Sequence, residues 1–518
     1  LSASYQNNPG TMPNTSLSEY SFRANVETKI ANILRVGTQS FVNHRYGDVA
    51  KVKDALTYLN QSVPAMTPEY KGMYGAIEGG VGNLNPQSME NSLARMLVSD
   101  GQNITTRINT TWYAGLDISD FLRLDVKYNY QDALWDEKKH DVNIKRYSFR
   151  TGDVLAEYNS DVNKATTYRS FTRQVAKNFI ATANFMKSFG AHDVSALAGY
   201  ETTYWNYNGF DASKIGLLDF GITDITTGID MNSIGGSYER DYAMKSFFGR
   251  VNYAYQGKYL VEANVRRDGS SRFASGHKWG TFPSISLGWR ISEEKFFSPL
   301  KSVVENFKLK ASLGQLGNVT SGYYDWQALY GSANLSLNES VSKGLYQSQL
   351  PNLALTWENV TIGDIGFEAS FLRQRLNVEF DAYQRQTKDV LVPSIYNYSS
   401  RGDVGIPKEN SADVRNRGLE LTLNWNDQIG DVRYSIGANF STNSNRVTKY
   451  MGKLQYGYDE NTPDVFGNPT YKYLNIGAVR DGDGVLEGHM LGEQFLQTIY
   501  HGNGSYFNGD GTVNPNGG

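Results

Sequence analysis

The feature that most constrains this chain is a strict alternation of apolar and polar residues, sustained over segments of six to ten residues. In residues 122–131, for example, Leu122, Leu124 and Val126 alternate with charged and amide side chains. Successive side chains of a β-strand point to opposite faces, so each segment predicts a strand between an apolar and a polar medium. Five segments carry the pattern clearly: residues 122–131, 259–266, 308–313, 376–382 and 419–426.

Two all-β classes fit this alternation. Strands of soluble β-proteins average about 5 to 6 residues, whereas a strand that crosses a bilayer at a tilt needs about 9 to 11. The second face is heavily charged here, as expected for the polar lumen of a membrane barrel. Length favours the membrane barrel, and a soluble protein such as a large lectin stays as the alternative.

Composition narrows the choice of partner and compartment. Aromatic residues make up 13 %, with 35 Tyr, although the mean hydropathy is only -0.49. Tyrosine suits a membrane–water interface, since its ring is buried and its hydroxyl stays wet. A net charge of -3 gives no field that would attract nucleic acid. Zero cysteines exclude a disulfide scaffold, and no apolar run reaches the roughly 18 residues of a transmembrane helix.

Short and long connections alternate along the chain, which is typical of outer-membrane barrels with short periplasmic turns and long extracellular loops. The exception is 292–306, where a longer, Pro-containing segment stands in place of a short turn. The predicted tight turns are 31–34, 115–120, 188–193, 256–258, 371–374 and 427–431. The predicted long loops are 47–103, 136–169, 208–241, 317–354, 398–414 and everything after Thr448.

This scheme gives about fifteen strands. Bacterial single-chain barrels have even strand numbers, so we expect the chain to be an incomplete barrel. The first residues read as a strand and no signal peptide precedes them.

Four sequence blocks resemble a known family. Residues 266–297, RRDGSSRFASGHKWGTFPSISLGWRISEEKFF, are similar to the characteristic hairpin of the starch-utilisation (SusC/RagA) type of TonB-dependent importers of Bacteroidetes. LKASLGQLGN at 309–318 resembles the next family segment, with Lys310, Leu313 and Leu316 departing from it. The blocks 357–393 and 416–425 then follow in the family's order.

The resemblance implies an all-β transmembrane antiparallel barrel of 22 strands in the bacterial outer membrane, of which about 15 are present. Residues 1–518 would form one partial barrel domain. The N-terminal plug, the TonB-contacting box and the C-terminal strands would lie outside this sequence. The partners it implies are a SusD-like surface lipoprotein, the TonB complex, outer-membrane lipid and a glycan or peptide substrate. No cofactor is implied.

No enzyme site is predicted. The six histidines show no metal-ligand spacing, and no nucleophile elbow or phosphate loop occurs. Asp481 with Asp483, and Asn508 with Asp510, resemble calcium turns, but neither completes an EF-hand loop, and Tyr506 and Asn514 replace the outer Asp residues of a related family loop. A Gly-Asn turn is the favoured explanation, so no metal site is predicted.

Aromatic residues near the predicted outer loops are the substrate-contact candidates, because flat rings stack on sugars or peptides. The favoured explanation is nevertheless that they belong to the aromatic girdle at the membrane interface. The candidates are Trp205, Tyr207, Tyr323, Tyr324 and Trp326.

The leading functional hypothesis is TonB-dependent import of a bulky nutrient, an oligosaccharide or peptide. The runner-up is a passive porin or structural outer-membrane barrel, and a soluble carbohydrate-binding protein is a third, less favoured class. We expect residues 1–518 alone not to form a stable inserted structure, because unpaired strand edges are costly in hydrocarbon. The alternation predicts that six residues face lipid: Leu122, Val126, Val261, Val378, Phe380 and Leu421.

Overall fold

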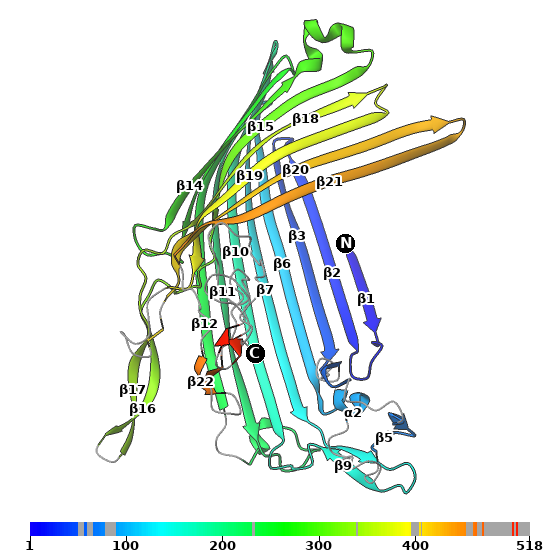
Figure 1. The fold of residues 1–518 in the computed structure, drawn as a ribbon, viewed down its shortest axis with the longest axis vertical. Coiled ribbons are helices and arrows are strands. Elements are labelled where there is room, and N and C mark those ends of the chain that lie inside the picture. The colour runs from blue at the N-terminus through cyan, green and yellow to red at the C-terminus, as the bar shows by residue number, and fades with distance from the viewer. Residues whose placement is uncertain are drawn as a thin grey trace. The chain divides into compact units, whose positions relative to one another are not determined.

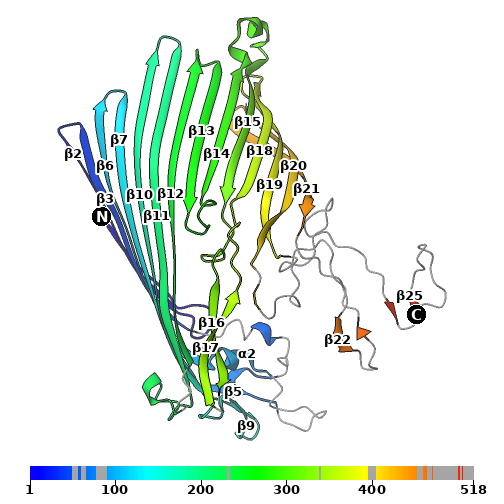
Figure 2. The same cartoon turned by 90° about the vertical axis from the view of Figure 1, so that its left-hand side faces the viewer.

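The computed structural model is dominated by one antiparallel sheet of 15 strands, which run side by side in Figures 1 and 2. It describes residues 1–49, 56–59, 66–77, 90–229, 234–337, 340–394, 404–405, 407–451, 459–463, 469–470, 500–501 and 504–505. The strands follow one another in chain order, apart from small loop strands, as in an up-and-down meander. The predicted count of fifteen is confirmed.

The strands of the sheet have the following bounds. They are β1 (Ser2–Asn8), β2 (Leu17–Ile30), β3 (Leu34–Asp48), β6 (Ser99–Ser119), β7 (Leu122–Asp141), β10 (Thr166–Phe189), β11 (His192–Ile215), β12 (Ile234–Tyr255), β13 (Tyr259–Ser270), β14 (Trp279–Arg290), β15 (Val304–Asn318), β18 (Glu358–Phe371), β19 (Leu376–Val392), β20 (Glu409–Ile429) and β21 (Val432–Tyr450).

The remaining elements are short. They are β4 (Glu69–Tyr70), β5 (Met73–Gly75), α2 (Ser92–Met96), β8 (Ile144–Tyr147), β9 (Val154–Tyr158), η2 (Ile225–Thr227), η3 (Ile291–Glu293), η4 (Lys295–Leu300), β16 (Leu329–Leu337), β17 (Ser340–Gln349), β22 (Asp459–Pro463), β23 (Pro469–Thr470), β24 (Tyr500–His501) and β25 (Gly504–Ser505). None of the helices in the described ranges is long and apolar enough to cross a membrane.

Several strands run further than their alternation predicted. β10 and β11 have 24 residues each, and β12 has 22. They take in parts of the stretches 136–169 and 208–241, which were predicted as loops. The predicted turn 115–120 is also mostly strand, since β6 continues to Ser119. The backbone ladder continues where the side chains of both faces are polar, so alternation marks only part of each strand.

The register of β13 to β21 separates two faces. One row pairs Tyr259 with Trp289, then Leu309, Phe367, Phe380, Leu421 and Phe440 on successive strands. The row through Val261 is Leu287, Ala311, Ile365, Ala382 and Leu419. We call the surface formed by these rows the apolar face. Val261, Val378, Phe380 and Leu421 share it, as predicted.

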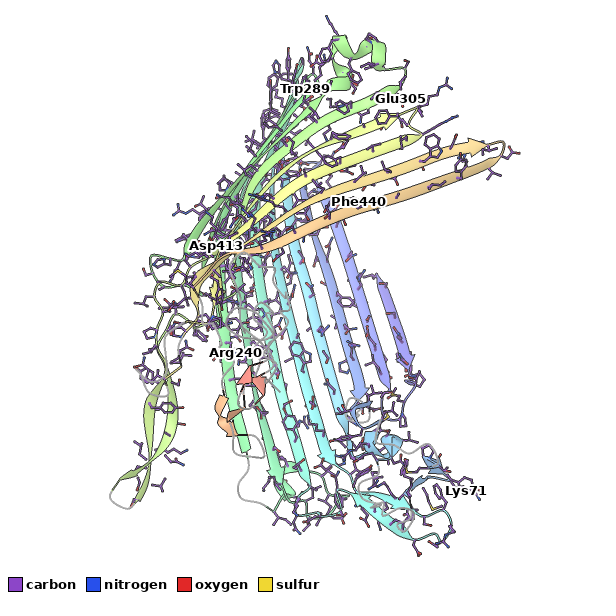
Figure 3. All side chains as sticks on the ribbon, viewed as in Figure 1. Lys71, Arg240, Trp289, Glu305, Asp413 and Phe440 are labelled. Carbon is purple, nitrogen blue, oxygen red and sulfur yellow. The ribbon has the colours of Figure 1, made fainter. Side chains whose placement is uncertain are left out.

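The apolar face is exposed in this chain. Ile365 is 65 % exposed, Phe440 is 63 % exposed and Leu287 is 50 % exposed, and Figure 3 shows Phe440 and Trp289 on their strands. Soluble monomers rarely expose apolar patches larger than a few hundred Å². The apolar face therefore calls for an apolar solvent, namely lipid.

The N-terminal strands show the same division. Val26 pairs with Thr38 and then Trp112, while Ile30 pairs with Leu34 and then Leu116. The Trp112 ring stacks on Tyr128 of β7 with centroids 5.9 Å apart, so Val126, which has the parity of Tyr128, lies on the same face as Trp112.

Adjacent residues on one strand provide a matched test of the two faces. In the full-length protein in liposomes, spin labels at Val261→Cys and Leu421→Cys should be more accessible to oxygen than to a water-soluble nickel chelate. Labels at their neighbours Glu262→Cys and Glu420→Cys should show the reverse order. Preferential nickel access at 261 and 421 would contradict the membrane assignment.

Candidate functional site

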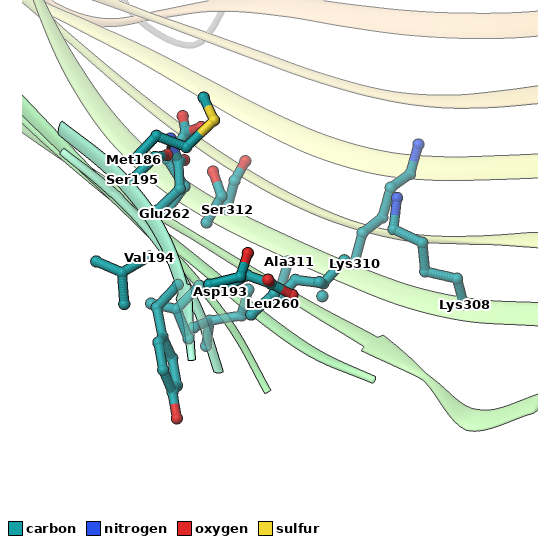
Figure 4. A pocket seen from close by; sticks show the side chains of 18 of the residues that line it. Met186, Asp193, Val194, Ser195, Leu260, Glu262, Lys308, Lys310, Ala311 and Ser312 are labelled. Atoms are coloured by element: carbon teal, nitrogen blue, oxygen red, sulfur yellow. Dashed lines mark hydrogen bonds between the residues drawn. The ribbon is translucent and has the colours of Figure 1, made fainter. Parts of the chain in front are cut away.

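The face opposite the apolar one carries the candidate chemistry, and we call it the polar face. Its central row pairs Glu262 with Ser286, then Ser312, Asp364 and Tyr383. A concavity of about 790 Å³ is lined in part by Asn252, Glu262, Lys310 and Asp364. Figure 4 shows the Lys308 and Lys310 side chains leaving β15 side by side.

An ion-pair network ties β15, β18 and β19 together on the polar face. Lys310 Nζ lies 2.7 Å from Glu379 Oε1, 3.0 Å from Asp381 Oδ1 and 3.8 Å from Glu368 Oε1. Lys308 Nζ lies 3.3 Å from the same Glu368 oxygen. The Lys310 side chain is 24 % exposed, whereas the Glu379 side chain is 50 % exposed, so water screens part of this network.

Carboxylates outnumber cations in this part of the polar face. Three carboxylates surround Lys308 and Lys310, and two more lie on the same face, at Asp364 and Glu420.

Lys310 should therefore matter for stability. Lys310→Met should lower the free energy of unfolding of the full-length barrel by about 1 kcal/mol, because three carboxylates lose their shared cation in a site that water partly screens. The midpoint of heat-modifiable migration on a gel would report this loss. Lys343→Met, on the exposed β16–β17 hairpin, is the matched control and should change little. Equal midpoints for the two variants would contradict the assigned role.

A second polar-face feature is a ladder of aromatic rings on β11 and β12. Trp205 stacks parallel to Tyr207 with centroids 5.6 Å apart, Tyr207 stacks on Tyr238 at 5.6 Å, and Tyr242 lies 5.7 Å from Trp205. The Tyr238 hydroxyl and the Thr172 hydroxyl of β10 are 2.8 Å apart. We call these four rings the aromatic ladder.

Hydrogen bonds fix the side of the sheet on which the ladder lies. Asn178 Nδ2 donates to Glu201 at 2.9 Å and to Thr203 at 2.8 Å. Glu201 and Thr203 have the parity of Trp205 and Tyr207 on β11, so the ladder continues a polar row. Two of the sequence-predicted candidates, Trp205 and Tyr207, are thus brought together, and Tyr238 and Tyr242 join them.

The other three candidates lie in a different setting. Trp326 packs against a buried cluster formed by Phe273, Phe282, Leu355 and Trp357. Tyr323 lies beneath the Arg272 guanidinium, 4.4 Å from its ring centroid, and its own ring is 6.4 Å from that of Tyr324. These contacts give Trp326 and Tyr323 a packing role at the loop end of β14 to β18.

Several residues of the sequence block at 266–297 pack into the buried cluster. The Phe282 ring fills the space beside Gly280 and Gly317, where a Cβ would come within 2.3 Å and 2.0 Å of ring atoms. The ring meets Trp357 at 5.5 Å, and Trp357 Nε1 donates to the Lys278 carbonyl at 3.0 Å. The block therefore builds a core at the loop ends of the strands.

Glu358 anchors three strands next to that cluster. It is buried and accepts hydrogen bonds from Asn318 Nδ2 at 3.0 Å, from the Thr320 hydroxyl at 2.6 Å and from the Leu391 N–H at 3.0 Å. Because the Glu358 carboxylate accepts its hydrogen bonds from groups of the same chain, we assign it a structural role.

The loops before β6 and after β7 form a small sheet of β4, β5, β8 and β9 with α2 beside it. Its centre is Tyr158, which is buried and donates to Glu90 at 2.6 Å. Burial, followed by the hydrogen bond to Glu90, raises the pKa of Tyr158 to about 12. The Arg95 and Arg146 guanidinium groups lie 4.7 Å and 4.1 Å from its ring centroid.

Nothing in the described ranges suggests metal chemistry, because no group of three or more His, Cys, Asp or Glu side chains gathers there. The calcium-like residues Asp481, Asp483, Asn508 and Asp510 lie outside the described residues.

Comparison with known proteins decides the family. The profile described as "TonB dependent receptor-like, beta-barrel" matches residues 70–517. The chain belongs to the TonB-dependent receptor β-barrel family. Its members are outer-membrane barrels, so the apolar face meets lipid and the polar face lines the lumen.

Curated relatives support the SusC/RagA type. TonB-dependent receptor P39 of Formosa agariphila is 30 % identical over 386 residues, which are 71 % of this chain and 36 % of that protein. TonB-dependent receptor SusC of Bacteroides thetaiotaomicron is 28 % identical over 318 residues, 60 % of this chain and 30 % of that protein. The chain thus spans about a third of the length of these relatives.

A solved structure shows the same fold. The RagAB peptide importer in its "open-open" state aligns with a TM-score of 0.70 at 23 % identity, over 91 % of this chain and 54 % of that one.

Proposed function

We propose that this chain is the barrel part of a TonB-dependent importer that moves a bulky nutrient, an oligosaccharide or a peptide, across the outer membrane. The observation that carries the proposal is the aromatic ladder on the polar face of a family barrel. Rings at that position line the route a substrate would take, and they offer apolar surface within an otherwise hydrophilic lumen. The RagAB neighbour is described as a peptide importer, which supports the same substrate size.

The proposal includes two kinds of partner. A plug domain in the lumen would couple to TonB, and the carboxylates around Lys310 offer acidic partners to cationic side chains on the plug surface. A SusD-like lipoprotein would cover the outer loops and deliver substrate.

Dependence of uptake on TonB and on the proton gradient distinguishes an importer from a passive porin. In the native host, uptake of the cognate nutrient through the full-length protein should stop when TonB is deleted or the proton gradient is collapsed. A porin would continue to pass solute under both treatments. Uptake that survives TonB deletion would overturn the importer proposal.

Substitutions in the ladder test the substrate route. The double variant Trp205→Ala, Tyr207→Ala should weaken substrate binding by roughly tenfold, because two ring contacts at about 0.5–1.5 kcal/mol each are lost. Tyr204→Ala is the control, since Tyr204 directly precedes Trp205 in sequence and has the opposite parity on β11, so it lies on the other face. Calorimetric titration of the purified full-length protein would measure the affinity. Equal affinities for the double variant and the control would contradict the assigned role.

A further inference from the structure

The connection between β14 and β15 is longer than a hairpin needs. The other described connections at this end of the strands are short turns, whereas residues 291–303 form η3, η4 and a following turn. Figure 2 shows this coiled segment beyond the ends of β14 and β15. A tight turn would close the hairpin equally well, so the extra residues need another explanation.

The segment folds onto the lipid side of the sheet. The Phe297 ring is buried and stacks on Phe307 with centroids 6.3 Å apart and an interplanar angle of 4°. Phe307 has the parity of Leu309 and lies 5.8 Å from Phe367, so it belongs to the apolar face. η4 therefore continues the lipid-facing surface.

Hydrogen bonds set the depth of the segment. Glu294, between η3 and η4, accepts from the Tyr259 hydroxyl at 2.6 Å and from Trp289 Nε1 at 3.2 Å, and Lys258 Nζ lies 3.4 Å away. Tyr259 and Trp289 are the last apolar-face residues of β13 and β14 at this end. Tyr and Trp at barrel rims sit at the level of the lipid headgroups, with their polar atoms toward water. Through its hydrogen bonds to Tyr259 and Trp289, Glu294 lies at the level of the lipid headgroups.

The outward surface of the segment is apolar with a basic border. Phe296 is 66 % exposed, Leu300 is 54 % exposed and Val303 is 51 % exposed. Lys295 is also exposed, and Lys301 lies 3.4 Å from Glu293. Large apolar side chains next to lysines at headgroup depth are the composition of an interfacial anchor, in which lysine stems lie along apolar surface and their ammonium groups reach phosphates.

We propose that residues 291–303 anchor the barrel in the periplasmic leaflet of the outer membrane. Phe296 and Leu300 enter the boundary between headgroups and acyl chains, and Lys295 meets the phosphates of phospholipid headgroups. The occupant is phospholipid rather than a periplasmic protein, because the surface is continuous with the apolar face through Phe297 and Phe307. The site lies on the opposite side of the sheet from the lumen and does not depend on the substrate.

Depth-dependent quenching tests the anchor. Environment-sensitive fluorophores would be attached to Phe296→Cys and Leu300→Cys in the full-length protein, with any cysteine outside this sequence replaced, in nanodiscs of phosphatidylethanolamine and phosphatidylglycerol. The matched control is Asp431→Cys, in the two-residue turn between β20 and β21 at the same end. Heat-modifiable migration would confirm that each variant is folded. Lipids carrying a nitroxide near the headgroup should quench positions 296 and 300 at least about twofold more than position 431.

Two outcomes would overturn the proposal. Quenching of 296 and 300 by aqueous iodide at the level of 431, with no excess quenching by lipid nitroxide, would show that the segment lies in water, leaving a periplasmic protein as its occupant. Maximal quenching by nitroxides deep in the acyl chains would show burial in hydrocarbon instead of at the interface.

Discussion

Backbone hydrogen bonding in hydrocarbon is the constraint on which the rest of this structure depends. An unpaired N–H or C=O costs several kcal/mol in lipid, so a chain that crosses it as strands must pair each strand with its neighbours. Pairing fixes the register, and register fixes the face, because a slip of one residue would exchange the two faces. The continuous row from Tyr259 to Phe440 and the neighbouring row from Glu262 to Tyr383 are the direct result.

The same constraint reverses the usual place of the hydrophobic core. The strands expose their apolar side chains to lipid and turn ionic ones inward, where Lys310 binds three carboxylates. In the part of the chain that the structure describes, buried apolar clusters lie near the loop ends of the strands, around Phe282 and Trp357, and in the loop sheet around Tyr158. Each is small because it has only a loop to stabilise.

The sequence predicts the strands and their faces well because a period of two is a local property. It underestimates β10 to β12, whose outer parts have polar residues on both faces, and it misses the β16–β17 hairpin inside the stretch 317–354. The candidate site is harder. Trp205 and Tyr207 can be identified as aromatic, but their contacts with Tyr238 and Tyr242 depend on the pairing of two long strands. The packing of Trp326 depends on Phe273 and Trp357, which are far away in the sequence.

The segment that carries the family resemblance most strongly is therefore informative about architecture and silent about substrate. Within 266–297, Phe273 and Phe282 form the core at the loop ends of the strands. At the opposite end, Glu294 binds Tyr259 and Phe297 stacks on Phe307. Both tasks are common to any substrate, so a shared block here identifies the barrel type only. Side chains on the polar face, in contrast, can vary without disturbing the ladder of backbone hydrogen bonds. The rings at Trp205, Tyr207, Tyr238 and Tyr242 occupy such positions, since the strand register is kept whatever side chain they carry.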